Sequence, residues 1–314
     1  MSKKWSKAEV RKLLELHDTN TYEQIAAKLN KFFGTDHSAN AVRKAHERYK
    51  FPVISIAERE DAPKMLFFDI ETVPLTAYVW GLWDNNVSLN MIESDWHVLS
   101  WSAKWYGSEE VMYQDQRNAK NFEDDKTILK GIWKLLDEAD IVIGQNSKKF
   151  DVKKLNARFI QHGMKPPSSF RQIDTLVIAK RHFGFTSNKL EYMTDKLCTK
   201  YKKSGHAKFP GFKLWSECMK GNIEAYNEME DYNKLDVLSL EELYEILIPW
   251  DDTINFSMYF NEDVCSCGST DFKKSGFYYT NSSKFQKYKC TSCGSEYRDK
   301  INLQKGKKFT KNPR

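Results

Sequence analysis

The two acidic residues with the most informative spacing are Asp69 and Glu71, which lie two positions apart in the apolar run MLFFDIETV. In a β-strand, positions i and i+2 face the same side, so these two carboxylates should project together. Two carboxylates in an otherwise apolar strand are costly to bury unless a cation neutralises them, and Mg²⁺ prefers oxygen ligands. The pair alone is weak evidence for a metal site, because surface strands often carry the same spacing.

Two further carboxylates could complete such a site. Asp151 ends the segment NSKKFD, which begins at Asn146 and follows an apolar run. Taken alone, Asp151 is better explained as an acid at a helix N-terminus, where the macrodipole stabilises it. Asp236 lies four residues after Tyr232, so the two share one face of a helix, although a solvated helix acid would explain Asp236 by itself. Asp174, in RQIDTLVIA, is expected to cap the following helix rather than to bind substrate.

Four of the six cysteines form two close pairs near the C-terminus, Cys265 with Cys267 and Cys290 with Cys293. The N-terminus is basic with no apolar stretch behind it, so no export signal is predicted, and close pairs then favour metal ligands over disulfides. A glycine follows each pair, as in the two knuckles of a zinc ribbon, where four sulfurs hold Zn²⁺. The second pair has the usual C-x-x-C spacing, whereas the first pair has only one intervening residue. The pattern predicts one structural Zn²⁺ in residues 263–300, with the other two cysteines in the core.

The middle of the chain, residues 65–250, carries strand signals first and then alternating helix and strand signals. Apolar or alternating runs predict strands in MLFFDIETV, HVLSWSAKWYG, EEVMYQ and DIVIGQN. Helical spacing predicts helices in DKTILKGIWKLLDEA, FDVKKLNARFIQHG, DTLVIAKRHF, NKLEYMTDKLC and NIEAYNEMEDYNKLDVLSLEELYEIL. This order predicts an α/β fold in which helices flank a mixed sheet.

Residues 1–50 carry the start signals of three short helices. Ser6 begins a capping-box pattern, Thr21 begins a second one, and Ser38 precedes a third helix. Three helices with short connections predict an N-terminal three-helix bundle of the helix-turn-helix type. Residues 51–64, with two prolines and the charged run ERED, are predicted to be a linker. The basic third helix offers four candidates for nucleic-acid contact: Arg43, Lys44, Arg48 and Lys50.

The net charge of +6 is distributed unevenly. Residues 1–50 hold 11 Lys/Arg against 6 Asp/Glu, residues 263–314 hold 12 against 4, and residues 51–262 hold 26 against 33. Two basic ends are typical of proteins that bind polyanions, because the release of counterions drives their association. A solvated surface with a disordered basic tail over 301–314 would explain the charge equally well. The mean hydropathy is −0.66, and no apolar run approaches the roughly 20 residues that span a bilayer, so a membrane protein is not expected.

Together, the acidic motifs resemble those of the DEDD superfamily of 3′–5′ exonucleases, which have an RNase H-like fold. The motifs occur in the family's order: Asp69 and Glu71, then Asn146 with Phe150 and Asp151, then Tyr232 and Asp236. The tyrosine before the last aspartate is typical of the DEDDy branch, which includes the proofreading domains of family A and B polymerases. The segment FFDIET also resembles the corresponding motif of a bacterial and phage branch of RNase H-like proteins.

The resemblance implies a two-metal mechanism with two Mg²⁺ or Mn²⁺ ions on the four acids, and release of nucleoside 5′-monophosphates from a 3′ end. It implies that Tyr232 orients the attacking water. A tyrosine, whose ordinary pKa is about 10, is better suited to this role than to the role of a general base at neutral pH. Asn146 is a candidate for nucleic-acid contact. Five tryptophans should divide between core packing and stacking on a single-stranded 3′ end: Trp80, Trp83, Trp96, Trp101 and Trp105.

The N-terminal segment resembles Myb/SANT-like and homeodomain-like DNA-binding domains, whose third helix enters the major groove. A bundle that docks proteins is the alternative. In the cysteine segment, lysines and Arg298 favour nucleic-acid contact, with protein–protein contact as the competing use.

We therefore predict a metal-dependent 3′–5′ exonuclease that acts on DNA, with RNA as the alternative substrate, and flanking modules that raise its effective concentration on DNA. Because 314 residues leave no room for a polymerase domain, proofreading would require a polymerase or another replication or repair protein in trans. A cytoplasmic location and a bacterial or phage origin are expected. The rival hypotheses are a structure-selective endonuclease or RNase on the same fold and a non-catalytic DNA-binding regulator.

Overall fold

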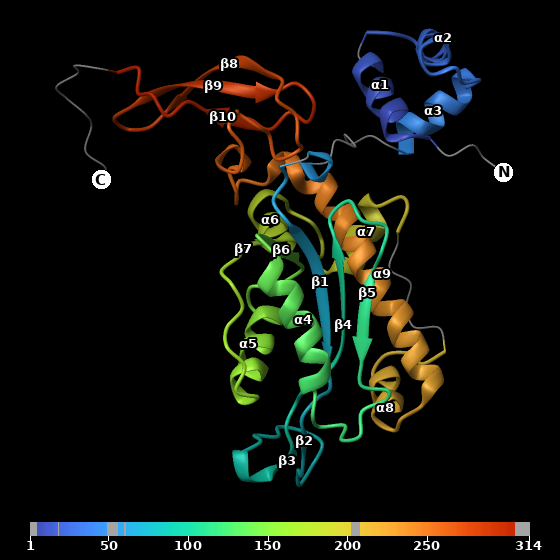
Figure 1. Ribbon diagram of the computed structural model, residues 1–314, viewed down its shortest axis with the longest axis vertical. Helices are drawn as coiled ribbons and strands as arrows, with labels where there is room; N and C mark the ends of the chain where they lie inside the picture. Colours follow the sequence, from blue (N-terminus) through green and yellow to red (C-terminus); the bar gives the residue numbers. More distant parts are fainter. Residues whose placement is uncertain (1–4, 18, 49–55, 60, 202–207, 305–314) are drawn as a thin grey trace. The chain divides into compact units, whose positions relative to one another are not determined.

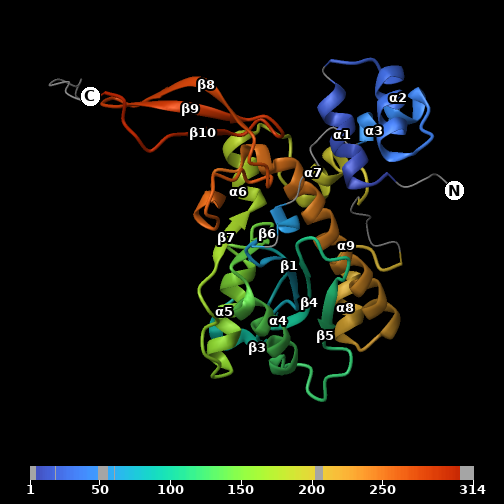
Figure 2. The same ribbon diagram turned by 45° about the horizontal axis from the view of Figure 1, so that its top comes forward.

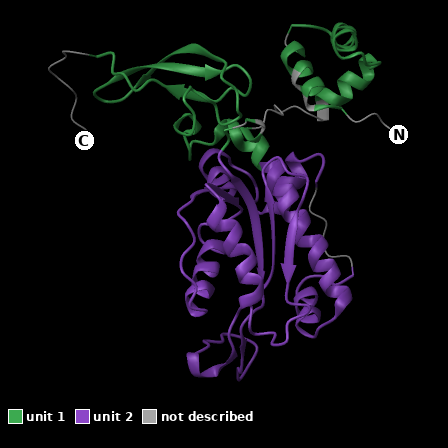
Figure 3. Ribbon diagram, in the orientation of Figure 1, with its two compact units in different colours: residues 1–62, 244–314 green, residues 63–243 purple. Residues whose placement is uncertain are grey.

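The computed structural model describes residues 5–17, 19–48, 56–59, 61–201 and 208–304. The chain forms two compact units, one of residues 63–243 and one of residues 1–62 with 244–314 (Figure 3). The first unit contains these elements: β1 (Met65–Thr72), β2 (Thr76–Ala77), β3 (Ile92–Ser94), β4 (Val98–Trp105), β5 (Met112–Asp115), α4 (Lys126–Glu138), β6 (Ile141–Gly144), α5 (Asp151–Gln161), β7 (Arg171–Asp174), α6 (Thr175–His182), α7 (Leu190–Leu197), α8 (Lys213–Met219) and most of α9 (Ile223–Leu247).

A five-stranded mixed sheet forms the centre of this unit, in the order β5-β4-β1-β6-β7 (Figure 1). β4 is antiparallel to both β1 and β5, whereas β1, β6 and β7 run parallel. The predicted strands and helices of the middle segment are all present. The predicted α/β fold with a mixed sheet flanked by helices is therefore confirmed; β2, β3, β7 and α8 are additional elements that the sequence patterns did not indicate.

The two faces of β1 have different surroundings. Leu66, Phe68 and Ile70 are buried with the apolar stripe of α4 and the inner residues of α5. The opposite side of the sheet is covered by α8 and α9, with a second core that includes Leu99 and Met229 (Figures 1 and 2). Since side chains alternate along a strand, the odd-numbered residues of β1 face the α9 side.

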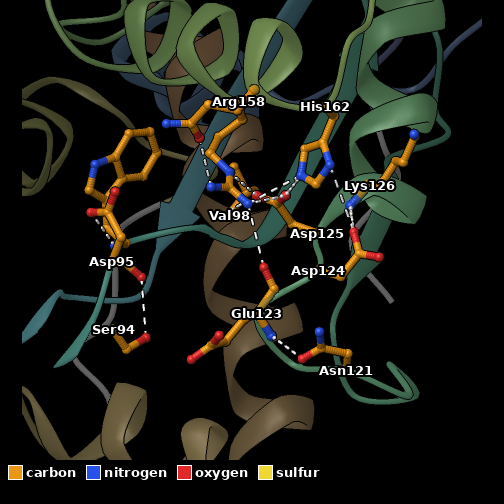
Figure 4. Close-up of polar contacts among 12 residues, drawn as sticks. Ser94, Asp95, Val98, Asn121, Glu123, Asp124, Asp125, Lys126, Arg158 and His162 are labelled. Atoms are coloured by element: carbon orange, nitrogen blue, oxygen red, sulfur yellow. Dashed lines mark hydrogen bonds and ion pairs between the residues drawn. The ribbon is translucent and has the colours of Figure 1, made fainter.

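A buried carboxylate joins the beginning of α4 to β4 and α5. Asp125 is 0% exposed, and its oxygens accept hydrogen bonds from the Val98 N–H at 2.8 Å and from Arg158 Nε and Nη2 at 2.9 and 2.8 Å. His162 Nε2 lies 2.7 Å from the same carboxylate. Figure 4 shows Arg158 of α5 and His162, the residue after α5, converging on Asp125. Every oxygen of this buried acid thus has a partner, as burial requires.

Asp125→Asn is expected to lower the free energy of unfolding by about 3–5 kcal/mol, because it leaves the Arg158 guanidinium, whose side chain is only 12% exposed, without a counter-charge. Chemical denaturation followed by tryptophan fluorescence measures the change. Glu138→Gln is the matched control, since it breaks the exposed Lys64–Glu138 ion pair and should leave the denaturation midpoint unchanged. Equal midpoints for the two variants would contradict the structural role of Asp125.

The N-terminal segment folds as three helices, α1 (Lys7–His17), α2 (Tyr22–Phe33) and α3 (Ala39–Arg48). Both predicted capping boxes are present: Ser6 and Glu9 bond reciprocally before α1, and Thr21 does so with the third residue of α2. Gly34 ends α2 with a φ of 64°, a left-handed conformation that favours glycine. The helices share a small apolar core: Leu13, Ile25, Ala26, Leu29, Val42 and Ala45.

The C-terminal segment is built on a three-stranded antiparallel sheet of β8 (Phe272–Tyr279), β9 (Lys284–Cys290) and β10 (Glu296–Arg298), in the order β10-β9-β8. β8 and β9 follow each other in the chain and form an antiparallel hairpin. Three 3-10 turns of the same unit also lie in described residues: Ile56–Glu58, Ile248–Trp250 and Phe256–Met258.

Candidate active site and metal centres

The first motif lies on the face of β1 that α9 covers. Asp69 and Glu71 are half-buried, and their cross-strand partners on β4 are Ser102 and Ser100. The predicted common face of the two acids is therefore present. Because the even-numbered neighbours fill the opposite core, the strand cannot turn these carboxylates away without exposing Phe68.

The long helix α9 brings a third carboxylate to this pair. Asp236 is 4% exposed, and one carboxylate oxygen from each of Asp69, Glu71 and Asp236 lies within 4.8 Å of the other two. Three carboxylates at this separation repel one another unless a cation lies between them. Their oxygen atoms are the donor type that Mg²⁺ and Mn²⁺ prefer, so the cluster can hold a divalent ion.

Asn233, which the sequence motifs did not single out, fixes the first aspartate. Its Nδ2 donates to Asp69 Oδ2 at 2.7 Å, and its own Oδ1 accepts from Ser100 Oγ at 3.3 Å. Ser102 Oγ donates to the Asn233 carbonyl at 2.7 Å. Asn233 is fully buried and lies three residues before Asp236, on the same helix face. The two serines opposite the acids therefore attach α9 to the sheet.

Asn233→Ala is expected to weaken Mn²⁺ binding by about 10-fold, because partners of metal ligands set the ligands' orientation. Titration of the full chain with Mn²⁺, followed by electron paramagnetic resonance of the free ion, measures the affinity. Asn227→Ala on the same helix is the control, since Asn227 is exposed and bonds Arg117 instead. Unchanged Mn²⁺ affinity in Asn233→Ala would show that Asp69 needs no such support.

Tyr232 lies beside the three carboxylates. Burial is the first cause that raises the pKa of its phenol well above the ordinary value, followed by the negative charges of Asp236, Glu71 and Asp69. The hydroxyl also hydrogen-bonds the Asp236 carboxylate, and its ring packs against Trp215 of α8 with centroids 6.2 Å apart. A phenol in this setting keeps its proton at neutral pH.

Asp151 is close to these groups but is not a member of the three-carboxylate cluster. It is 3% exposed at the first residue of α5, and its Oδ1 accepts the Ile70 N–H of β1 at 3.2 Å. Burial is the main reason that the pKa of Asp151 is raised to about 7; backbone hydrogen bonds, including the one from Ile70, act against this shift, and the nearby Asp174 charge adds to it. The four predicted acids therefore divide into a cluster of three and a fourth that contacts the backbone between Asp69 and Glu71.

Comparison with known families decides the class of this domain: residues 94–248 match the family model described as RNase_H superfamily. This segment is an RNase H-like superfamily domain. The match begins after β1, so the Asp69–Glu71 pair lies before its first residue, while Asp151 and Asp236 lie inside it. The match and the acidic cluster support a nuclease that acts on nucleic acid.

One similar solved structure is the family B DNA polymerase from the hyperthermophilic archaeon Pyrobaculum calidifontis, at 16% identity and a TM-score of 0.45. The similarity covers 66% of this chain and 27% of that chain. No curated protein matches the chain.

The loop of the RNase H-like domain that precedes α5 is held by Asp174. The Asp174 carboxylate accepts the N–H groups of Asn146 at 2.9 Å, Lys148 at 3.2 Å and Leu176 at 3.0 Å. The bond to Leu176 is the predicted cap of α6, whereas the other two bonds were not foreseen. Asn146 has a φ of 63°, in the left-handed region that asparagine adopts more readily than most residues other than glycine. Asp174 therefore sets the path from β6 to Asp151.

The tryptophans divide as expected between buried and exposed positions. Trp101 is 3% exposed, and Trp105 packs against the same core. Trp96 is half-buried under the Lys154 ammonium, which lies 3.5 Å from its ring centroid. Trp80 and Trp83 are 102% and 86% exposed in the segment between β2 and β3, so their rings are accessible to a ligand.

The four C-terminal cysteines form a second group that can hold a metal ion. Their sulfur atoms lie within 4.8 Å of one another, with Cys265 Sγ 3.4 Å from Cys293 Sγ and Cys267 Sγ 3.8 Å from Cys290 Sγ. These distances are too long for disulfides and fit the separation of about 3.8 Å that four Zn–S bonds of about 2.3 Å require in a tetrahedron. The four cysteines thus fit a zinc ribbon despite the short first knuckle. The other two cysteines are buried as predicted: Cys198 and Cys218.

The predicted nucleic-acid contacts of the N-terminal bundle lie on or after α3. Arg43 and Lys44 are exposed, Arg48 is the last residue of the helix, and Lys50 lies outside the described residues. Residues 51–55 and 60 of the predicted linker and residues 305–314 of the predicted basic tail also lie outside the described residues. Within the described part of the chain, no helix is long and apolar enough to cross a membrane.

Proposed function

We propose that this protein is a divalent-metal-dependent 3′–5′ exonuclease whose catalytic residues are Asp69, Glu71, Asp151, Tyr232 and Asp236. One observation carries the proposal: three carboxylates from β1 and α9 meet beside a half-buried, protonated tyrosine in an RNase H-like domain. The order of the motifs adds support, because Y-x-x-x-D is typical of the DEDDy branch.

The metal ligands we propose are Asp69, Glu71 and Asp236, with Asp151 as the fourth carboxylate of the site. Two Mg²⁺ or Mn²⁺ ions bound there would neutralise the carboxylates and the phosphodiester and lower the pKa of a bound water. The donor set fits these ions, since it consists of oxygen atoms only.

The protein's own contribution is positioning. The Tyr232 hydroxyl keeps its proton and therefore orients the attacking water through a hydrogen bond rather than removing a proton from it. Asn233 holds Asp69, and Asp151 holds β1 through the Ile70 N–H. The water oxygen would form the new P–O bond while the 3′ oxygen of the preceding nucleotide leaves, which releases a nucleoside 5′-monophosphate.

The flanking segments complete the proposed organisation. Residues 1–50 would bind duplex DNA through Arg43, Lys44, Arg48 and Lys50, residues 51–64 would link them to the nuclease of residues 65–250, and residues 263–300 would hold one structural Zn²⁺ before the basic tail of 301–314. Asn146 would contact the substrate strand. We propose DNA rather than RNA as the substrate and, for proofreading, a polymerase or other replication or repair protein as partner.

Oligonucleotides labelled at the 5′ end or the 3′ end test the reaction. With Mn²⁺, a 5′-labelled strand should give a ladder of single-nucleotide losses, and a 3′-labelled strand should release a labelled mononucleotide first. Chelation of the ion should stop both reactions. A single internal cut would instead indicate the structure-selective endonuclease, faster cleavage of RNA would indicate the RNase, and no cleavage of any strand would leave the non-catalytic DNA-binding regulator.

A further inference from the structure

The sheet of the cysteine module has one face with an unusual concentration of positive charge. Side chains alternate along β9, so its odd-numbered residues share one face with the residues opposite them on β8 and β10. We call this surface the basic face. Its members are Lys273, Tyr278, Phe285, Lys287, Lys289, Glu296 and Arg298.

Two pairs of like charges lie directly across from each other on the basic face. Lys273 is opposite Lys289, and Lys287 is opposite Arg298. Such cross-strand pairs destabilise a sheet. Among the described residues of this face, Glu296 is the acid that offsets them, with its Oε2 3.0 Å from Lys287 Nζ. The positive charge of the basic face is therefore only partly neutralised, and a site for an anionic ligand requires such an excess of positive charge.

Aromatic rings continue the basic face toward the end of the hairpin. Tyr278 is 46% exposed and lies opposite Phe285. The Arg298 guanidinium stands 4.3 Å from the Phe285 ring and 5.3 Å from the Tyr278 ring. A planar cation therefore already lies over these rings, and a nucleobase can stack on an exposed aromatic ring.

The opposite face of the sheet is used differently. Tyr297 packs edge-on against Phe272 there, and its hydroxyl donates to Cys265 Sγ at 3.2 Å. Part of that face therefore supports the cysteine cluster. The cations and rings of the basic face have no comparable role in that cluster.

We propose that the basic face binds single-stranded nucleic acid, with phosphates along the row of Lys273, Lys287, Lys289 and Arg298 and a base stacked on Tyr278. A single strand fits better than a duplex, because stacking on Tyr278 needs an open base face. This site goes beyond the proposed exonuclease function and does not depend on cleavage.

Binding of a fluorescent oligothymidylate of about 12 nucleotides to the full chain tests the proposal. All proteins carry Asp69→Asn, so that cleavage cannot interfere, and anisotropy is recorded over a range of salt concentrations. The triple variant Lys287→Gln/Lys289→Gln/Arg298→Gln should bind at least about 10-fold more weakly near 0.1 M salt, with the salt slope reduced by about 2. Tyr278→Ala should weaken binding at least about fivefold with the salt slope unchanged.

The matched control is Lys130→Gln/Lys134→Gln/Lys165→Gln, which removes the same charge from exposed lysines of the other unit and should retain the original affinity. Bound zinc and circular dichroism must match across the variants, which separates lost binding from lost folding. Equal losses in the two triple variants would overturn the proposal. So would a higher affinity for duplex that depends on the basic face, or displacement of the oligonucleotide by an acidic peptide of equal charge. These outcomes are independent of whether the protein with Asp69 intact cleaves DNA.

Discussion

Asp69→Asn is expected to reduce phosphodiester cleavage by about 10³-fold or more while leaving the affinity for DNA nearly unchanged. The substitution removes one of the three charges of the carboxylate cluster but keeps a side chain of the same size for Asn233 to contact. Loss of a preorganised charged group at a reacting centre typically costs about 10²–10³ in rate, and here it also weakens the hold on the metal. Cleavage of a 5′-labelled strand in Mn²⁺, together with its binding in a chelator, separates the two effects.

Asp231→Asn is the matched control for this experiment. Asp231 is an exposed aspartate on α9, outside the carboxylate cluster, so its substitution should leave the cleavage rate within about twofold of the original. Full cleavage by Asp69→Asn would place the reaction elsewhere in the molecule. A parallel loss of cleavage and of secondary structure would show instead that the cluster only stabilises the fold.

Cys290→Ser is expected to lower bound zinc from about one ion per chain to about one tenth of that, because a structural zinc site needs all four thiolates. The three-stranded sheet should then lose its order, since the cysteine cluster joins the ends of β8 and β9 and few buried apolar side chains lie between the strands. Metal analysis after gel filtration measures the zinc, and limited proteolysis measures the order of residues 263–304.

The control for the zinc experiment is Cys198→Ala. Cys198 is buried in the other unit, and its Sγ lies 3.9 Å from the Ser239 carbonyl, so the zinc content should stay the same. Retention of zinc by Cys290→Ser would mean that three thiolates hold the ion. A metal other than zinc in the purified protein would contradict the proposed identity of the ion without affecting the cysteine geometry.

Local patterns in the chain were sufficient to predict most of the fold. The capping residues Ser6 and Thr21 accept hydrogen bonds from N–H groups three residues away. Because this contact is local, the start of each helix can be predicted from the sequence. The same holds for the shared face of Asp69 and Glu71, which follows from strand periodicity alone. β7 and α8 escaped prediction because RQID and KLWSECM are too short for a clear period, and packing rather than propensity holds them.

The sequence by itself determined which side chains have the chemistry for two metal centres: its paired acids and Y-x-x-x-D motif for one, its paired cysteines for the other. Only the tertiary structure decided which of them meet. Asp236 joins Asp69 and Glu71 because Ser100 and Ser102 attach α9 to β4 through Asn233, and Asp151 binds the Ile70 N–H because Asp174 sets the loop before α5. These contacts join residues far apart in the chain, and no local pattern encodes a hydrogen bond whose partner is chosen by the packing of helices on a sheet.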